Sequence, residues 1–272
     1  MAKKKEPVPV AEGTPEVLID PVDQKEPVEL TEQEKAYVEH DIKATEKKTE
    51  EVLASIEAKK KAEAEKVIQD NRKRIIDLLK KTKRDRVDIL IEELEDDGFF
   101  RAPASGGYHS NQEGGLAAHT LNVVQNAEKI GVALLGGAGY NLIQNSVIIA
   151  AVLHDLGKVG DYGKRFYVPN MIQDGKPTKA DPVQKYKQSE KKPWKRNSDL
   201  TNIPHGIRSA IIANRWFELT EDEEYAICFH DGMYEPSNRA VIPGHETPLL
   251  LIIHWADMWA SHVQEGTAGD DE

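Results

Sequence analysis

Apolar residues are distributed unevenly along the chain, and this separates a charged N-terminal part from an apolar remainder. Residues 1–29 are rich in Pro, Glu and Val without periodicity, which predicts a disordered tail. From Thr31 to Asp70 the chain is rich in Lys, Glu and Ala and contains no Pro or Gly, which favours helix. Because its apolar positions are too sparse for a convincing heptad seam, a solvated single helix or a loose linker is favoured over a coiled coil.

Helical spacing of apolar residues begins after residue 70. Ile75–Leu79 and Val87–Leu94 show this spacing and are separated by a basic run from Lys80 to Arg84. We therefore expect two amphipathic helices at the start of a folded domain. Residues 97–107 contain Gly and Pro at intervals that predict a loop.

The rest of the apolar pattern predicts a helical domain with one interruption. From the spacing we expect further helices over residues 115–130, 141–156, 204–217, 221–230 and 247–264. The second of these is apolar nearly all round, which predicts a central buried helix. Residues 161–200 instead alternate like short strands, around Arg165–Val168 and Val183–Tyr186, with a turn signal at Asp174-Gly175. The predicted fold class is all-α, with a small β-hairpin insertion.

Length and charge refine this organisation. The 272 residues suffice for one good-sized domain plus an extension, and we divide the chain into an extension (1–70), a folded domain (71–265) and an acidic disordered tail (266–272). The net charge of -11 argues against a basic protein that coats duplex DNA, although it allows a local basic patch. Residues 161–200 carry 10 Lys/Arg against 5 Asp/Glu, interleaved with aromatic residues. Such a segment either binds a nucleotide or single strand by charge and stacking or is an ordinary solvated hairpin, and the two readings are equally supported.

The sequence also bears on the compartment. The single cysteine, Cys228, excludes an internal disulfide framework and suits a reducing cytoplasm, where we expect the protein. Its apolar neighbours indicate a buried thiol rather than a nucleophile. The N-terminal Lys run is followed by Pro, Val and Glu, so no signal peptide is expected. No uninterrupted run of about 18 apolar residues occurs, so we expect no membrane span.

A set of His and Asp residues spread over the predicted elements is the main chemical signal. An apolar run ends in the adjacent pair His154-Asp155, which Gly157 and Lys158 follow. The other members are His119, His205, His230 and Asp257, each supplied by a different predicted helix. Burial of an ionised carboxylate is costly unless it is paired or binds a metal. If the elements converge, the set forms one site for divalent cations.

The donor types restrict the metal. His and carboxylate ligands without thiolates favour Mn, Fe, Ni, Co or Zn over Ca, and Mg remains possible. One or two ions are compatible with the set, because a bridging Asp155 could hold two, with His205 and His230 completing the second site. Two ions about 3.5–4 Å apart would generate a hydroxide nucleophile and stabilise the leaving oxygen of a phosphoryl displacement.

The order of these motifs resembles that of the HD-domain metal-dependent phosphohydrolases, whose signature is H…HD…D. The matching segments are Gly98–Ser105, Tyr108–His109, Glu113–Val123, Leu153–Lys158, Pro204–Ser209, Leu219–His230 and Leu251–Met258. The likeness covers about residues 72–264 and is to stand-alone bacterial and phage HD hydrolases. These are themselves similar to the HD domain of bacterial 3′–5′ exoribonucleases. The likeness of this chain to the HD hydrolases implies an HD-domain helical bundle.

The resemblance also implies roles for individual residues. The first metal would be bound by His119, His154, Asp155 and Asp257, while His205 and His230 would complete a second site or bind phosphate. Asp155, Lys158 and His109 would be the catalytic residues, with Lys158 neutralising phosphate charge in the transition state. The substrate-binding candidates are Lys158, Arg208, Arg165, Glu113 and His254, and His254 could also orient a ligand. His245 and His262 are expected at the surface.

The implied activity is hydrolysis, by metal-activated water, of a phosphate ester of a nucleotide, dinucleotide or short single-stranded nucleic acid. The chain lacks the N-terminal OB-fold of the exoribonucleases and has Asp231 where they have a second His, which argues against processive RNA degradation. The net acidity slightly favours a small substrate. The alternative is a non-catalytic metal- or nucleotide-binding module, with residues 30–95 docking a partner or mediating self-association. The complete ligand set speaks against that alternative.

Overall fold

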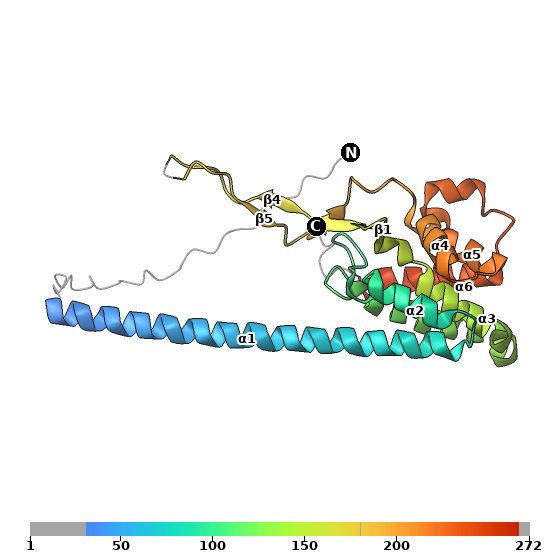
Figure 1. The fold of residues 1–272 in the computed structure, drawn as a ribbon, viewed down its shortest axis with the longest axis horizontal. Helices are drawn as coiled ribbons and strands as arrows, with labels where there is room; N and C mark the ends of the chain where they lie inside the picture. The colour runs from blue at the N-terminus through green and yellow to red at the C-terminus, as the bar shows by residue number, and fades with distance from the viewer. Residues whose placement is uncertain (1–30, 180, 267–272) are drawn as a thin grey trace, which may run out of the picture. The chain divides into compact units, whose positions relative to one another are not determined.

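The structure, a computed structural model, describes residues 31–179 and 181–266, and the chain divides into two compact units, residues 1–58 and 59–272 (Figure 1). The disordered tails predicted at the two ends lie almost entirely outside the described residues.

The described part of the first unit is helical. Helix α1 (Glu32–Lys81) runs through it and continues into the second unit. Val52, Leu53 and Ile56 are exposed, as expected of a solvated helix. The helix predicted at Ile75–Leu79 is the end of α1 rather than a separate element, because no Pro or Gly interrupts the preceding segment.

The second unit confirms the predicted helical class. Its main helices after α1 are α2 (Val87–Asp96), α3 (Gly115–Leu153), α4 (His205–Trp216), α5 (Glu221–Cys228) and α6 (Pro248–Trp259). Short 3₁₀ helices connect them at η1 (Phe99–Arg101), η2 (Leu156–Lys158), η3 (Gly232–Tyr234) and η4 (Pro236–Ala240). One π-helical turn, η5 (Ala260–Gln264), follows α6. The capping-box pattern at the start of α5 is realised: the Thr220 hydroxyl accepts from the Glu223 N–H, and the Glu223 carboxylate accepts from the Thr220 N–H.

Two helices that were predicted separately are joined in α3. Gly136, with φ 69° and ψ 166°, breaks it into two halves. By length and composition alone, the segment Gly115–Lys158 would suffice to cross a membrane. The break at Gly136 divides that segment. Val123 and Val147, one from each half, are buried in the core of the second unit, while Leu134 and Leu142 on either side of the break are exposed. The expectation of no membrane span stays a prediction.

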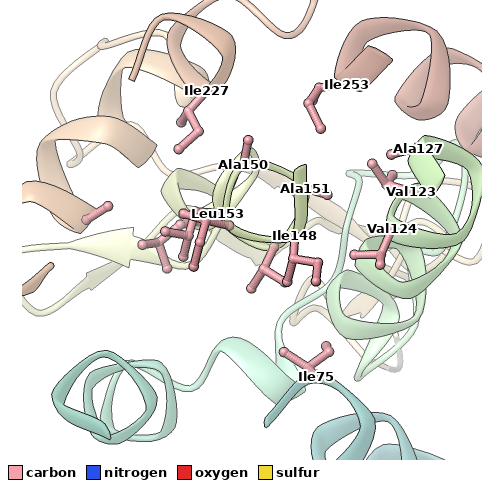
Figure 2. Packing of buried hydrophobic residues seen from close by; sticks show 14 of the residues in the cluster. Ile75, Val123, Val124, Ala127, Ile148, Ala150, Ala151, Leu153, Ile227 and Ile253 are labelled. Atoms are coloured by element: carbon pink, nitrogen blue, oxygen red, sulfur yellow. The ribbon is translucent and has the colours of Figure 1, made fainter. Parts of the chain in front are cut away.

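The second half of α3 lies at the centre of this core (Figure 2). The core residues around it come from the end of α1, the first half of α3, α5 and α6, at Ile75, Val123, Ile227 and Ile253. Ala150 and Ala151 have small side chains and are fully buried, which lets neighbouring helices approach. Full burial of each Ile or Leu contributes roughly 1.5–3 kcal/mol. Because the last seven residues of this half, Val147–Leu153, are all buried, the position of its C-terminal end at His154 is fixed.

The described residues of the insertion form three short antiparallel ladders. They pair β1 (Gly160–Asp161) with β2 (Lys164–Arg165), β3 (Tyr167–Pro169) with β6 (Trp194–Arg196), and β4 (Met171–Gln173) with β5 (Tyr186–Gln188). In Figure 1, β4 and β5 run side by side in the segment drawn in yellow to gold. The predicted antiparallel insertion is confirmed, but the turn is not tight. Residues 174–185 link β4 to β5, so the strand expected at Val183–Tyr186 begins only at Tyr186.

Candidate metal centre

The His and Asp residues singled out in the sequence converge in the structure. They come from the first half of α3 (His119), its C-terminal end (His154 and Asp155), the first residue of α4 (His205), the segment after α5 (His230) and α6 (Asp257). Four of them are buried almost completely: His119, His154, Asp155 and His230. The predicted helices therefore bring their candidate ligands to one place, where neighbouring donor atoms lie within reach of a shared cation.

The first group of donors contains His119, His154, Asp155 and Asp257. His119 Nε2 lies 3.1 Å from Asp257 Oδ1 and 3.6 Å from Asp155 Oδ2. His154 Nε2 lies 3.3 Å from His119 Nε2 and 3.4 Å from Asp155 Oδ2. Two ligands that are each about 2.1 Å from one ion are themselves about 3.0–3.4 Å apart. The group thus has the spacing of a metal site.

The second group uses the other oxygen of Asp155. Asp155 Oδ1 lies 3.3 Å from His205 Nε2 and 3.5 Å from His230 Nε2, and the two imidazole nitrogens are 3.1 Å apart. Asp231, which the sequence analysis did not predict as a donor, places Oδ2 3.4 Å from His205 Nε2. One carboxylate therefore faces a separate imidazole-rich group with each of its oxygens.

The hydrogen bonding of the rings fits this role. His154 Nδ1 donates to the carbonyl of Ala151 at 2.8 Å, and His230 Nδ1 donates to that of Ile227 at 2.8 Å. A ring nitrogen that donates to a carbonyl leaves the other nitrogen as a lone-pair donor for metal. Asp155 Oδ1 is buried and has no hydrogen-bond partner within the described residues. An ionised oxygen in that position is costly without a cation, so the donor set fits a divalent metal.

Electrostatics keep the carboxylates of the cluster ionised. Burial alone would raise the pKa of Asp155, but the Lys158 ammonium and the His154 ring hold it well below its usual value. For His119, burial is outweighed by hydrogen bonds to Asp257 and Glu265, which raise the pKa to about 9. For His230, the charges of Asp231 and Asp155 outweigh burial and likewise raise the pKa to about 9.

His154 differs, because burial lowers its pKa despite the adjacent Asp155. The cluster therefore combines ionised carboxylates with imidazoles that must lose protons when a metal binds.

Glu265 is a functional candidate that the sequence pattern does not single out. It follows the π turn η5 and accepts hydrogen bonds from His119 Nδ1 (3.1 Å), His109 Nδ1 (3.0 Å), Ser110 Oγ (2.6 Å) and Asn122 Nδ2 (2.8 Å). Burial opposes its ionisation, but the hydrogen bonds from His109 and His119 hold its pKa below the usual value. A carboxylate behind a metal-binding imidazole fixes the orientation of the ring.

Lys158 pairs with Asp155, and Gly157 holds η2 against α4. Lys158 Nζ lies 2.6 Å from Asp155 Oδ2. The N–H of Gly157 donates to Ser209 Oγ at 2.7 Å. A Cβ at position 157 would lie 2.3 Å from the carbonyl oxygen of His205, so only glycine allows η2 and the start of α4 to approach this closely.

A cavity of about 670 Å³ opens beside the cluster. Its polar lining includes His109, Lys158, Asp231, His254 and Asp257. Its remaining lining includes Tyr108, Tyr234 and His262. His262 is exposed, as predicted, and its ring stacks on Tyr234 with the centroids 5.9 Å apart. Aromatic and ionic groups therefore line one cavity.

His254 is held beside the second donor group. Its Nδ1 donates to the carbonyl of His230 at 2.8 Å. Its ring packs so closely on Gly232 that a Cβ there would lie 2.4 Å from it. His254 thus supports the segment that carries His230 and also reaches the cavity.

Three predicted substrate-binding residues lie elsewhere. Arg208 is buried, with Nη2 donating to the carbonyl of Thr201 at 2.6 Å and Nη1 3.4 Å from Asp161 Oδ2. Arg165 and Glu113 line a second cavity of about 240 Å³, which Lys158 also borders. The sequence does not show that Arg208 is buried while Arg165 lines a cavity, because the partner of Arg208, Asp161, lies in a distant strand.

Comparison with known proteins gives one relative of known activity. Over 94 residues the chain is 32% identical to dihydroneopterin 2',3'-cyclic phosphate phosphodiesterase from Methanocaldococcus jannaschii, which covers 35% of this chain and 36% of the relative. No family model matches the chain, and no solved structure matches it. The chain is thus similar, over about a third of its length, to a phosphodiesterase. Together with the buried His/Asp cluster, this supports a phosphohydrolase.

Proposed function

We propose that the chain is an HD-type metal-dependent phosphohydrolase that cleaves a phosphate ester of a nucleotide, dinucleotide or short single-stranded nucleic acid. One observation carries the proposal: each oxygen of the buried Asp155 faces a separate group of imidazoles, and Oδ1 has no hydrogen-bond partner within the described residues. The similarity to a phosphodiesterase supports the class of reaction.

The two donor groups define which residues would hold metal. His119, His154, Asp155 and Asp257 would bind one divalent ion, and Asp155, His205, His230 and Asp231 a second. Bound ions of this kind act as Lewis acids on a phosphoryl oxygen and make water a stronger nucleophile at neutral pH. The mixed imidazole and carboxylate donors favour Mn, Fe, Ni, Co or Zn, with Mg possible.

The residues of the chain supply binding and proton transfer. Lys158 borders the cavity and stays protonated, since Asp155 raises its pKa against the effect of burial. We assign it the neutralisation of phosphate charge in the transition state. His109 also lines the cavity, and its Nδ1 is bound to Glu265, which fixes the ring. We assign it proton exchange with the leaving oxygen.

The proposal is tested by hydrolysis of bis-p-nitrophenyl phosphate and of a panel of nucleotides with Mn, Mg, Ni, Co or Zn added. Asp155→Asn keeps the shape of the side chain but removes the charge that both donor groups share. We expect about a thousandfold loss of turnover, together with loss of bound metal measured by elemental analysis.

Asp88→Asn is the matched control, because Asp88 is exposed on α2 and lies outside the cluster. It should leave turnover and metal content unchanged, and circular dichroism should show the same helical signal for both variants. An Asp155→Asn protein that hydrolyses within tenfold of wild type would refute the proposal. Wild-type protein that binds stoichiometric metal and hydrolyses nothing in the panel would favour the non-catalytic module.

A further inference from the structure

Positive charge outnumbers negative charge in the insertion, although the chain as a whole is acidic. Residues 164–196, here called the basic arm, carry 10 Lys/Arg against 3 Asp/Glu, whereas the whole chain has a net charge of -11. The arm's lysines are all exposed, at positions 164, 176, 179, 185, 187, 191, 192 and 195. Among the described residues of the arm, only two lysines, Lys185 and Lys187, form ion pairs with a carboxylate. The arm thus presents mostly uncompensated charge to solvent.

The arm carries exposed apolar and aromatic groups among these charges. Met171, Ile172 and Tyr186 are each about half exposed on the paired strands β4 and β5. A two-stranded hairpin without a core is only marginally stable in water. The alternation of Lys185, Tyr186 and Lys187 therefore adds little to the stability of the fold. It does match the combination of charged and stacking surfaces that binds unpaired bases.

The root of the arm contacts the loop that borders the cavity. Trp194 Nε1 donates to the carbonyl of Asn111 at 2.6 Å, and the Trp194 N–H donates to that of Gly106 at 3.1 Å. Gly107 lies so close to the arm that a Cβ there would be 2.9 Å from Lys192 Cα. Lys192 Nζ lies 6.0 Å from the ring centroid of Tyr108, which lines the cavity. The charged surface of the arm therefore reaches the rim of the candidate metal centre.

We propose that the basic arm binds the backbone of a single-stranded nucleic acid and leads one end of it to the metal centre. The preferred substrate is then an oligonucleotide rather than a mononucleotide, which rests on the proposed function. Trp194 pairs with Pro169 and Lys185 lies opposite Asp174, so this part of the arm is five residues of extended strand, about 17 Å, in length. That length suits the lower end of the range of single-strand sites, roughly 4–16 nucleotides. A duplex fits less well, because its bases are not free to stack on Tyr186.

Binding is tested apart from catalysis, by fluorescence anisotropy of a labelled 15-nucleotide oligothymidine in EDTA. The test variant is Lys187→Glu/Lys191→Glu/Lys195→Glu. The matched control, Lys47→Glu/Lys48→Glu/Lys60→Glu, makes the same charge change at exposed positions of α1. We expect the arm variant to bind at least tenfold more weakly, and its salt dependence of log K to be shallower by about 2, since each lost phosphate contact removes about 0.7. The control should bind like wild type.

Catalysis is measured in the same proteins with bis-p-nitrophenyl phosphate, which is too small to need the arm. Its turnover should be unchanged in the arm variant, while kcat/KM for the 15-mer falls at least tenfold. The inference is overturned if the arm variant binds the 15-mer within twofold of wild type, if the control loses as much affinity, or if a duplex competes as well as a single strand. Arm-dependent strand binding without hydrolysis of bis-p-nitrophenyl phosphate would support the arm and refute the proposed function.

Discussion

Glu265 offers the sharpest test of how the candidate metal centre is supported, because it contacts His119 without lying in either donor group. Its side chain is buried and accepts hydrogen bonds from His119, His109, Ser110 and Asn122. Glu265→Gln keeps the shape and one acceptor oxygen. It removes the negative charge and places an NH₂ group among four donors.

The magnitude follows from the change in the His119 hydrogen bond. A hydrogen bond to a charged group contributes roughly 1.5–3 kcal/mol and a neutral one roughly 0.5–1.5 kcal/mol, so the substitution costs about 1–2 kcal/mol at His119. That corresponds to roughly 5–30-fold weaker metal binding, which overlaps the lower part of the roughly 10–100-fold range typical of carboxylates behind metal-binding histidines. The loss should fall on the ion held by His119, because the second donor group does not contact Glu265.

The assay is competition with a chromophoric chelator, which gives the affinity of each metal equivalent without any turnover. We expect one equivalent to weaken and the other to stay within twofold of wild type. Glu218→Gln, at an exposed position after α4, is the matched control and should change neither. If Glu265→Gln binds both equivalents as tightly as wild type, Glu265 does not support the centre and the reasoning is wrong.

Two further predictions concern packing and reactivity. Gly157→Ala should destabilise the fold by roughly 1–3 kcal/mol, as overpacking of a core site does, because its Cβ would lie 2.3 Å from the His205 carbonyl oxygen. The same clash should lower the metal content. Urea unfolding measures the stability, and elemental analysis measures the metal. Gly137→Ala, where a Cβ meets nothing within 4 Å, is its control, and equal stability of the two variants would contradict the packing argument. Burial, with a smaller effect of Glu224, raises the pKa of the Cys228 thiol from 9.0 to about 11. At pH 8 the thiolate fraction of Cys228, and with it the rate of alkylation by iodoacetamide, should be about a hundredfold below that of an ordinary thiol. The rate should rise as the pH approaches 11. Alkylation of Cys228 as fast as that of glutathione would exclude the raised pKa.

The sequence pointed to the His and Asp residues that lie together in the structure, because the pattern around each of them is local. His154 and Asp155 end an apolar run, and His119 lies in an apolar stripe, so both helices had to bury an ionisable face. The helical class and the antiparallel insertion followed from periodicity in the same way. The sequence does not show how these residues are arranged relative to one another, because that depends on how Val147–Leu153, the buried end of α3, packs in the core.

The two acids that were missed depend on geometry that no local pattern records. Glu265 follows a π turn and contacts His119. The apolar spacing predicts a helix that ends at residue 264, one residue before it. Asp231 was noticed only as a difference from a related pattern, yet its carboxylate lies 3.4 Å from His205. The resemblance implies a substrate-binding role for Arg208, and the sequence does not show that Arg208 is buried with Asp161 as a long-range partner.

The structure separates the chemistry of the centre from the selection of substrate. Asp155 occupies the junction of α3 and η2, with φ -106° and ψ 10°, a sparsely populated region where active-site residues are often found. Its position is set by the core on one side and by the Gly157–Ser209 contact on the other. The exposed lysines of the basic arm share neither support. The base of the arm contacts the loop that carries Tyr108 and His109, and its first strand, β2, pairs with β1 close to Lys158. Changes to the arm should therefore alter which phosphate ester reaches the cavity, while the donor groups that we propose to act on it stay in place.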